Sequence, residues 1–258
     1  MTNGHYQLTS ASFGWRWNGK GIMLATCGDG VMETQMAFQL SIGGSIPTSS
    51  LQNYWIEPIS YSLAMDIVVE KHYLHRKCPV SFAFGLFNYS SLMPVGVVTY
   101  GVSPSSTLLK GICGESEKFN VYELNRLWVD DSIPKNGESY LIGRTIKRLD
   151  REIIVSYADS SQAHIGVVYQ ATNFIYTGLS AKFLDPKVKG LENQHHATYA
   201  NGLTNKEVVE KFGKDNVYFK ERSRKHRYIY FNARGKRKLE LLDKLRYQVL
   251  PYPKEITE

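Results

Sequence analysis

The sequence predicts a fold of the α/β or α+β class, with one central mixed β-sheet flanked by helices. Segments with the two-residue period of strands alternate with segments of helical spacing after residue 51. Residues 121–159 have the pattern strand, helix, strand, which requires a right-handed crossover between parallel strands. Residues 80–87 and 94–100 have the pattern of an antiparallel hairpin. A sheet with both kinds of pairing is a mixed sheet.

One further helix is predicted before the crossover unit. Residues 61–72 carry apolar side chains at helical spacing, and Ser60 precedes them as a candidate N-cap. The polar segment 88–91 joins the two hairpin strands that follow.

The crossover unit has polar residues at each joint. A strand over 121–129 leads through the connection 130–139 into a helix over 140–149. The apolar strand 153–159 then leads into a helical segment over 164–174. Functional groups of open α/β sheets gather where strands end, and a helix N-terminus after a strand is a ready anion site. We therefore expect the functional site in this unit.

Shorter elements follow towards the C-terminus. Residues 184–205 have a loop-like composition, and residues 205–212 resemble a short capped helix. Strands are predicted at 217–219 and 228–231, and a basic amphipathic helix is predicted over 236–246.

Length and composition exclude several classes of protein. The 258 residues suffice for one large or two small domains, and 43% hydrophobic residues suit a soluble globular protein. The apolar runs are too short to span a membrane, and the first residues lack a signal-peptide pattern. The three cysteines, Cys27, Cys78 and Cys113, form neither a metal-site spacing nor a disulfide framework, which favours a reducing cytoplasm. Residues 1–50 hold eight glycines and few charges, and predict a β-hairpin or a loose extension.

The net charge of +7 comes from one end of the chain. Residues 206–258 hold 15 of the 31 Lys and Arg residues but 8 of the 24 Asp and Glu residues, a difference of 7. This asymmetry predicts a polyanionic partner, and a solvated basic helix explains it equally well.

The cations around the aromatic strand 228–231 are the candidate DNA contacts, since basic residues neutralise phosphates and aromatic rings stack on bases. They are Arg224, Lys225, Arg227, Arg234, Lys236, Arg237 and Lys238. The last four begin a predicted helix, where positive charge opposes the helix dipole, so neutralising them is predicted to leave stability unchanged or slightly improved. The structural alternative is a sheet edge guarded by charge.

His72 and Tyr73 end the first predicted helix, where the helix dipole favours a protonated imidazole. In a functional interpretation His72 is a general base, or an iron ligand beside Tyr73. In the structural alternative His72 caps the helix and Tyr73 packs against it.

Arg126 lies in a strand with mostly apolar neighbours. Strict alternation puts its side chain on the face of Leu124, opposite Asn125. A buried guanidinium needs an anionic partner. We expect either a structural pair with Asp159 or Asp130, or a role in which Arg126 clamps a bound anion or orients Asp159.

Three more side chains are candidates for the site. Ser139 is predicted to head the helix as its N-cap, where free N–H groups bind phosphate or stabilise an oxyanion. Asp159 closes the apolar strand that also contains Ser156. Tyr169 lies in the following helix, where the structural alternative is a core tyrosine with one hydrogen bond.

The order of these segments resembles the GNAT acyltransferase superfamily. In that fold a strand carries a general base, the next loop and helix N-terminus hold the pyrophosphate of acetyl-CoA, and the next strand splays away to form a cleft. Residues 123–129, 134–139, 153–159 and 164–178 fall into those roles. The resemblance makes Tyr169 the proton donor to a leaving group. The loop 134–139 departs from the superfamily pattern because it contains a single glycine.

A closer resemblance is to the phage Mom family, a divergent GNAT-like group that modifies adenine in phage DNA. Six runs carry it in the same order, across roughly residues 55–253, and residues 1–50 have no counterpart in it. The runs are EKHYLHR at 70–76, ELNRLWV at 123–129, PKNGES at 134–139, VSYAD at 155–159, YQATNF at 169–174 and KHRYIYF at 225–231.

This resemblance implies an enzyme that puts an acetamide-like group on the exocyclic amine of adenine, which shields phage DNA from host restriction enzymes. The base has to be flipped out of the duplex to be reached. The implied catalytic residues are His72, Tyr73, Arg126, Ser139, Asp159 and Tyr169. The implied cofactor is either an acyl-CoA-like donor held by Asn136, Gly137 and Ser139, or ferrous iron bound by His72, Tyr73 and Asp159.

The resemblance also implies a division of the chain. Residues 1–50 would be an extension, 51–204 a GNAT-like catalytic core, and 205–258 a basic part that completes the sheet and contacts double-stranded DNA. We expect the protein in the cytoplasm of the infected bacterial host, as a monomer or a homodimer. Two alternatives stay open: a GNAT-like acyltransferase acting on a small molecule or protein, and a non-catalytic DNA-binding protein on the same scaffold.

Overall fold

The computed structural model describes strands 13–17, 23–27 and 30–32, and residues 51–255 except 92, 193 and 195. The chain divides into two compact units, Met1–Thr48 and Ser49–Glu258. In the first unit, β1 (Phe13–Trp17), β2 (Met23–Cys27) and β3 (Gly30–Met32) form an antiparallel sheet in the order β1-β2-β3. A hairpin or a loose extension was expected for this region.

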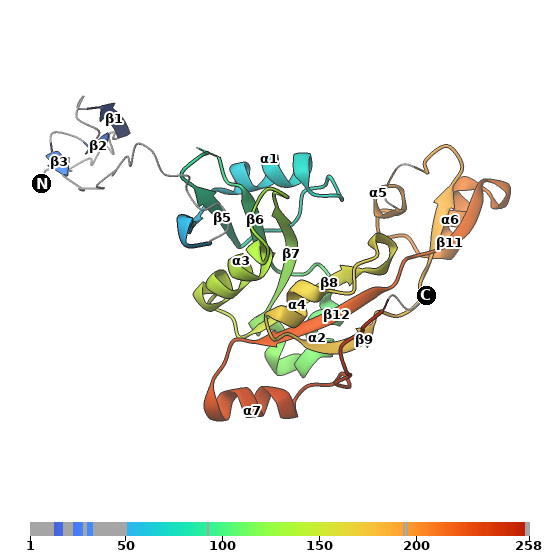
Figure 1. The fold of residues 1–258 in the computed structure, drawn as a ribbon. Helices are drawn as coiled ribbons and strands as arrows, with labels where there is room; N and C mark the ends of the chain where they lie inside the picture. The colour runs from blue at the N-terminus through green and yellow to red at the C-terminus, as the bar shows by residue number, and fades with distance from the viewer. Residues whose placement is uncertain are drawn as a thin grey trace, which may run out of the picture. The chain divides into compact units, whose positions relative to one another are not determined.

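The second unit is built around a seven-stranded sheet in the order β4-β5-β6-β7-β8-β12-β9 (Figure 1). Its strands are β4 (Tyr54–Pro58), β5 (Phe82–Asn88), β6 (Gly96–Gly101), β7 (Val121–Val129), β8 (Ile153–Asp159), β9 (Ile175–Leu179) and β12 (Lys225–Phe231). In this sheet β7 and β8 are parallel, and the other neighbours are antiparallel. The predicted class, a central mixed sheet flanked by helices, is confirmed.

Helices cover both faces of this sheet. Leu141 and Ile142 of α3 (Gly137–Thr145) and Tyr169 of α4 (Val167–Ala171) pack with Leu124 on one face. The other face packs against α1 (Tyr61–Lys71), α2 (Ser106–Cys113) and α7 (Gly235–Asp243). Short 3-10 helices lie at η1 (Leu51–Asn53), η2 (Glu115–Asn120), η3 (Ile146–Arg148), η4 (Ser160–Gln162) and η5 (Lys214–Asn216).

Between β9 and β12 the chain forms an arm, residues 184–221, that includes the predicted boundary at 204/205. Its strands β10 (Leu184–Val188) and β11 (Val217–Glu221) pair antiparallel. Two short helices, α5 (His196–Ala200) and α6 (Asn205–Phe212), accompany them and share a small apolar cluster with the strands. Figure 1 shows the arm beyond the carboxyl end of β8.

Two of the expected local structures are wrong. The loop expected at 184–205 contains β10 and α5, because Val188 and Tyr199 become buried together. The helix expected at 164–174 is shorter, because the positive φ angles of Gly166 (77°) and Asn173 (62°) mark its two ends. No helix among the described residues is long and apolar enough to span a lipid bilayer.

Candidate active site between two splayed strands

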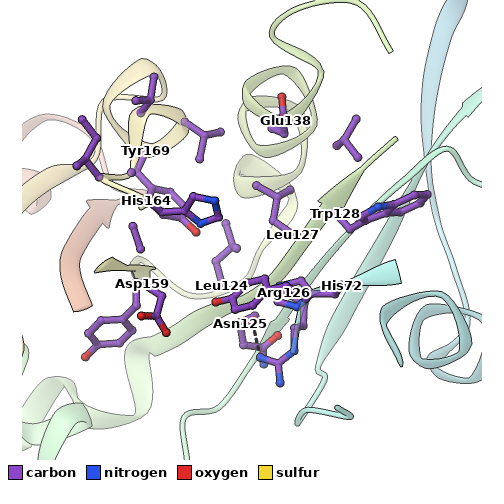
Figure 2. Close-up of a pocket in the computed structure, with 18 of the residues that line it drawn as sticks. His72, Leu124, Asn125, Arg126, Leu127, Trp128, Glu138, Asp159, His164 and Tyr169 are labelled. Carbon is purple, nitrogen blue, oxygen red and sulfur yellow. Dashed lines mark hydrogen bonds between the residues drawn. The ribbon is translucent and has the colours of Figure 1, made fainter. Parts of the chain in front are cut away.

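The parallel strands β7 and β8 separate part-way along their length. They pair over Val121–Leu124 and Ile153–Ser156, and beyond this point each stays paired with its outer neighbour, β6 or β12. The gap holds a cavity of about 400 Å³. It is lined by the carboxyl halves of both strands, by His72 and Tyr73 after α1, and by the start of α4 (Figure 2). The cleft that the GNAT resemblance implies is therefore present.

A β-bulge marks the start of the separation. On β6, Tyr100 faces Leu124 whereas the preceding Thr99 faces Arg126, so Asn125 is an extra residue in β7. Leu124 consequently points with Tyr100 into the core under α3, and Arg126 lies on the opposite face. The prediction that Arg126 shares the face of Leu124 is wrong, because the bulge interrupts the alternation.

The Arg126 guanidinium is held by backbone carbonyls and not by a carboxylate. Its Nε and Nη2 donate to Arg76 O at 3.4 and 3.3 Å, and its Nη1 donates to Asn125 O at 2.6 Å. Within the described part of the chain it forms no ion pair, so the pair expected with Asp159 or Asp130 is absent. Three of the five N–H groups of an arginine are used here. The charge of Arg126 is thus available to an anion in the cleft.

Asp159 ends β8 and is 7% exposed. Its Oδ1 accepts hydrogen bonds from Ser161 N at 3.0 Å, Ser161 Oγ at 2.8 Å and Ser223 Oγ at 2.9 Å. Its Oδ2 lies 3.4 Å from Lys225 Nζ. Burial raises the pKa of Asp159, but the bonds from Ser161 and Ser223 and the charge of Lys225 outweigh it and hold the pKa below its usual value. Asp159 is therefore an ionised acceptor at neutral pH.

His72 is buried at the end of α1. Its backbone N–H caps the helix by donating to Val68 O, and its ring Nδ1 accepts a hydrogen bond from Leu74 N at 3.1 Å. Burial, followed by the charge of Arg126, lowers the pKa of His72 to about 4. The imidazole is therefore neutral, and the expectation of a protonated ring at the helix terminus is wrong. Because Nδ1 accepts, the ring proton is assigned to Nε2.

A row of aromatic rings lines the cavity next to His72. The rings of His72 and Tyr73 stack with centroids 4.4 Å apart, and the ring of His164 meets Tyr73 edge-on at 6.2 Å. Tyr73 is 41% exposed, and its pKa is raised first by burial and then by the charge of Asp159. His164, which the sequence analysis did not select, lies in the exposed loop between β8 and α4. A flat heterocycle that enters the cleft can stack on these rings.

Tyr169 lies deep on the α4 side of the cleft. Burial raises its pKa to about 12, and its hydroxyl is hydrogen-bonded to Ser156. The Ser156 hydroxyl in turn donates to Leu124 O at 2.9 Å, at the last paired position of β7 and β8. Tyr169 is thus protonated at neutral pH, which is the state that a proton donor requires.

The start of α3 departs from the prediction. The N-cap is Asn136, with φ +75°, and Ser139 lies within the first turn, where its Oγ donates to Asn136 O at 3.1 Å. The prediction of Ser139 as N-cap is therefore wrong. Asn136 and Ser139 line a second hollow, which Lys147 also lines, and Gly137 is buried. Glu138, by contrast, lines the cleft.

These positions bear on the two implied cofactors. Glu138 lines the cleft, and the role of Asn136, Gly137 and Ser139 in holding an acyl-CoA-like donor stays a prediction. Among the described residues no group of three His, Cys, Asp or Glu side chains could hold a metal ion. The ferrous iron site expected at His72, Tyr73 and Asp159 stays a prediction.

The seven predicted DNA contacts fall into two groups. Four hold groups of the protein itself: Lys225 holds Asp159, Arg224 donates to Ser180 O, Arg227 donates to Thr177, and Arg237 pairs with Glu117 and Glu152. Arg234, Lys236 and Lys238 are exposed. Arg237 donates hydrogen bonds to the carboxylates of Glu117 and Glu152, which raise its pKa, and its contact with DNA stays a prediction.

A mixed sheet with a polar cleft between two splayed parallel strands makes this a protein of the GNAT-like fold class. The chain belongs to the Mom protein family, whose model matches residues 53–254. It is 31% identical over 211 residues to the methylcarbamoylase mom of Escherichia phage Mu, a match that covers 77% of this chain and 83% of that protein.

Solved structures of acetyltransferases are more distantly similar. The Arabidopsis thaliana NAA60 complex with acetyl-CoA matches with a TM-score of 0.42 and 11% identity, over 69% of this chain and 99% of that chain. The putative acetyltransferase yncA of Salmonella typhimurium matches with a TM-score of 0.41 and 9% identity, over 71% and 96%.

Proposed function

We propose that the protein is a transferase that modifies adenine in double-stranded DNA. It adds an acetamide-type, carbamoylmethyl-like group to the exocyclic amine, in the cytoplasm of an infected bacterium, and the modified DNA resists host restriction. Membership of the Mom family supports this proposal, as does a relative named as a methylcarbamoylase. The observation that carries it is the pairing, in one cleft, of an ionised carboxylate, Asp159, with a protonated phenol, Tyr169.

The cleft suits a flipped adenine. Tyr73 and His164 offer ring faces and edges at one side of the cavity, and stacking there offsets part of the cost of removing the base from the duplex. Asp159 accepts a hydrogen bond from the exocyclic amine, as carboxylates do with amino groups of bases. The amine nitrogen is then held between the aromatic row and the two strand ends.

Transfer forms a bond between the amine nitrogen and a carbon of the donor, and the bond from that carbon to its leaving group breaks. One proton leaves the amine, on the side where Asp159 accepts it. Tyr169 supplies a proton to the leaving group, and Arg126 stabilises negative charge that develops in the cleft. A CoA-dependent acyltransferase acting on small molecules is less well supported, because Glu138 faces the cleft.

Nucleoside analysis tests this function. The chain is expressed in a bacterium, its DNA is digested to nucleosides, and these are separated and weighed by mass spectrometry. We expect a heavier deoxyadenosine and unchanged deoxycytidine. An Asp159→Asn variant serves as the inactive control, and Lys206→Gln, at an exposed position of α6, as the active one. An unmodified deoxyadenosine pool in cells rich in folded protein would contradict the proposal.

A further inference from the structure

The hairpin of the arm has two faces of different character. In the antiparallel register Val188 faces Val217 and Pro186 faces Phe219. Val188 and Val217 join the apolar cluster of the arm, so this is the inner face, which is covered at Val188 and Val217 whereas Phe219 is 48% exposed. Lys187 faces Tyr218 on the opposite, outer face, and the outer face continues with Asp185 opposite Lys220.

The outer face is cationic and aromatic. Phe183 is 54% exposed and Tyr218 is 40% exposed. The Asp185 carboxylate on this face is neutralised by Arg222, which donates to its two oxygens at 2.9 and 2.6 Å and also lies over the Phe183 ring. The remaining cations are the lysines of the two facing pairs, Lys187 and Lys220, and in the described part of the chain neither has an ion-pair partner. Aromatic rings therefore lie between positively charged side chains on the outer face. Protein surfaces with this pattern bind single-stranded nucleic acids and phosphate backbones.

This face is connected directly to the candidate active site. Ser223, the residue after Arg222, donates to Asp159, and Lys225 lies beside the same carboxylate. Tyr218 precedes Ser223 by five residues, and most of this segment belongs to strand β11. At roughly 3.3 Å per residue the segment is about 17 Å long, and its Ser223 end contacts Asp159. At 3.4 Å per base pair, that is about five base pairs of DNA.

We propose that the outer face of the hairpin, formed by Phe183, Lys187, Tyr218, Lys220 and Arg222, is a DNA-binding surface. It contacts the sugar-phosphate backbone about five base pairs to one side of the modified adenine. The lysines neutralise phosphates, and the rings pack on sugars or on unstacked bases. The choice of DNA as the partner of this surface rests on the proposed function. It is separate from the basic helix α7, at the start of which the sequence had predicted DNA contacts.

Paired lysine variants test the surface. Lys187→Gln with Lys220→Gln removes two charges from the outer face. Lys206→Gln with Lys214→Gln removes two exposed charges from α6 and η5 of the same arm and is the matched control. Binding of a fluorescent 30-base-pair duplex is measured by anisotropy at several salt concentrations. We expect the outer-face pair to reduce the slope of log K against log salt by about 1.8, which is two contacts at 0.9 each. The control pair should keep the slope of the parent protein.

A third variant, Tyr218→Ala, should weaken binding without a change of slope, because stacking releases no counterions. All the altered side chains are partly or wholly exposed, so thermal melting should match the parent protein and show that each variant is folded. An unchanged slope in the outer-face pair, or an equal drop in the control pair, would overturn the proposal.

The same samples separate this inference from the proposed function. If the parent chain leaves deoxyadenosine unmodified while the outer-face pair loses salt slope, the chemistry is wrong and the surface stands. If the parent chain modifies deoxyadenosine while the outer-face pair binds DNA like the parent, the surface is wrong and the chemistry stands. Duplexes that end two or eight base pairs from the target adenine give a further check, since shortening the correct flank should weaken binding only when the hairpin lysines are present.

Discussion

Asp159 and Lys225 face each other across β8 and β12, with 3.4 Å between Oδ2 and Nζ. Lys225 therefore supports the carboxylate that lines the cleft, although its basic neighbours had suggested a contact with phosphate. The pair links the C-terminal strand of the sheet to the candidate active site.

Lys225→Gln should impair the reaction more than DNA binding. Without the lysine charge the pKa of Asp159 rises and its carboxylate is less well placed, so we expect about a tenfold lower rate at saturating DNA, or about 1.4 kcal/mol. Product is quantified as modified deoxyadenosine per hour, and affinity by anisotropy. Lys206→Gln, at an exposed position of α6, is the control. A tenfold loss of affinity with an unchanged rate would assign Lys225 to DNA instead.

Tyr169→Phe should remove the proton donor and keep the fold. Loss of a positioned general acid costs about 100-fold or more. The ring still fills its place among buried neighbours, so the melting temperature should stay close to that of the parent chain. Full activity in a folded Tyr169→Phe protein would exclude the tyrosine from proton transfer.

The free energy of unfolding should fall as the pH drops from about 6.5 towards 4, because the buried His72 ring resists protonation. Its pKa in the folded protein is about 4, below the ordinary value of 6.5, so the unfolded chain takes up a proton first. Stability from the neutral ring is complete above pH 6.5 and is lost as the pH falls towards the folded pKa, by at most about 1.4 kcal/mol per pH unit. Urea unfolding at pH 7, 6 and 5 measures this slope. His72→Gln should flatten it, and equal slopes in both proteins would contradict a buried neutral imidazole.

Arg237→Gln should destabilise the fold, in contrast to the expectation that neutralising the start of this helix leaves stability unchanged. Arg237 holds Glu117, whose side chain is 7% exposed and whose pKa is lowered to about 2, first through its hydrogen bond from Arg237. We expect a loss of about 2 kcal/mol, a value reduced for the partial exposure of Arg237. Chemical denaturation at pH 7 measures it. Lys236→Gln is the control, and equal stability of the two variants would contradict the prediction.

Gly166→Ala should distort the loop that carries His164. Gly166 has φ +77°, and a Cβ there would lie 2.4 Å from Cε2 of the buried Tyr228. We expect a loss of about 2 kcal/mol or more together with reduced modification. Gly143→Ala in α3 is the matched control, because a Cβ there meets nothing within 4 Å and alanine favours the helix. Thermal melts of both variants decide the matter, and a Gly166→Ala protein as stable as the parent would contradict this account of the loop.

Local sequence patterns were sufficient to predict the central elements. The strands predicted at 121–129 and 153–159 coincide with β7 and β8, and the helix predicted at 205–212 coincides with α6. Local periodicity suffices for such segments, since each carries a complete apolar pattern and clear end signals. The location of the site at strand ends also followed, because chain order and crossover handedness restrict which ends can meet.

The sequence was less informative where the elements are short. β4, α2, β9 and β10 were not predicted, and each covers only five to eight residues. Pairing and burial against distant segments stabilise them, as with β9, which pairs with β12 at sequence separations such as Leu179 to His226 and Ile175 to Ile229. Local patterns carry little of that information.

The protonation and orientation of each functional group depended on contacts made in the folded chain. The bulge at Asn125 turned Arg126 to the opposite face, and the contact between Leu74 N and His72 Nδ1 set the proton on that ring. Asp159 received its partners Ser223 and Lys225 from more than 60 positions away. Residue type and spacing identify candidates, but protonation and orientation depend on burial and on neighbours that only the folded chain brings within hydrogen-bonding distance.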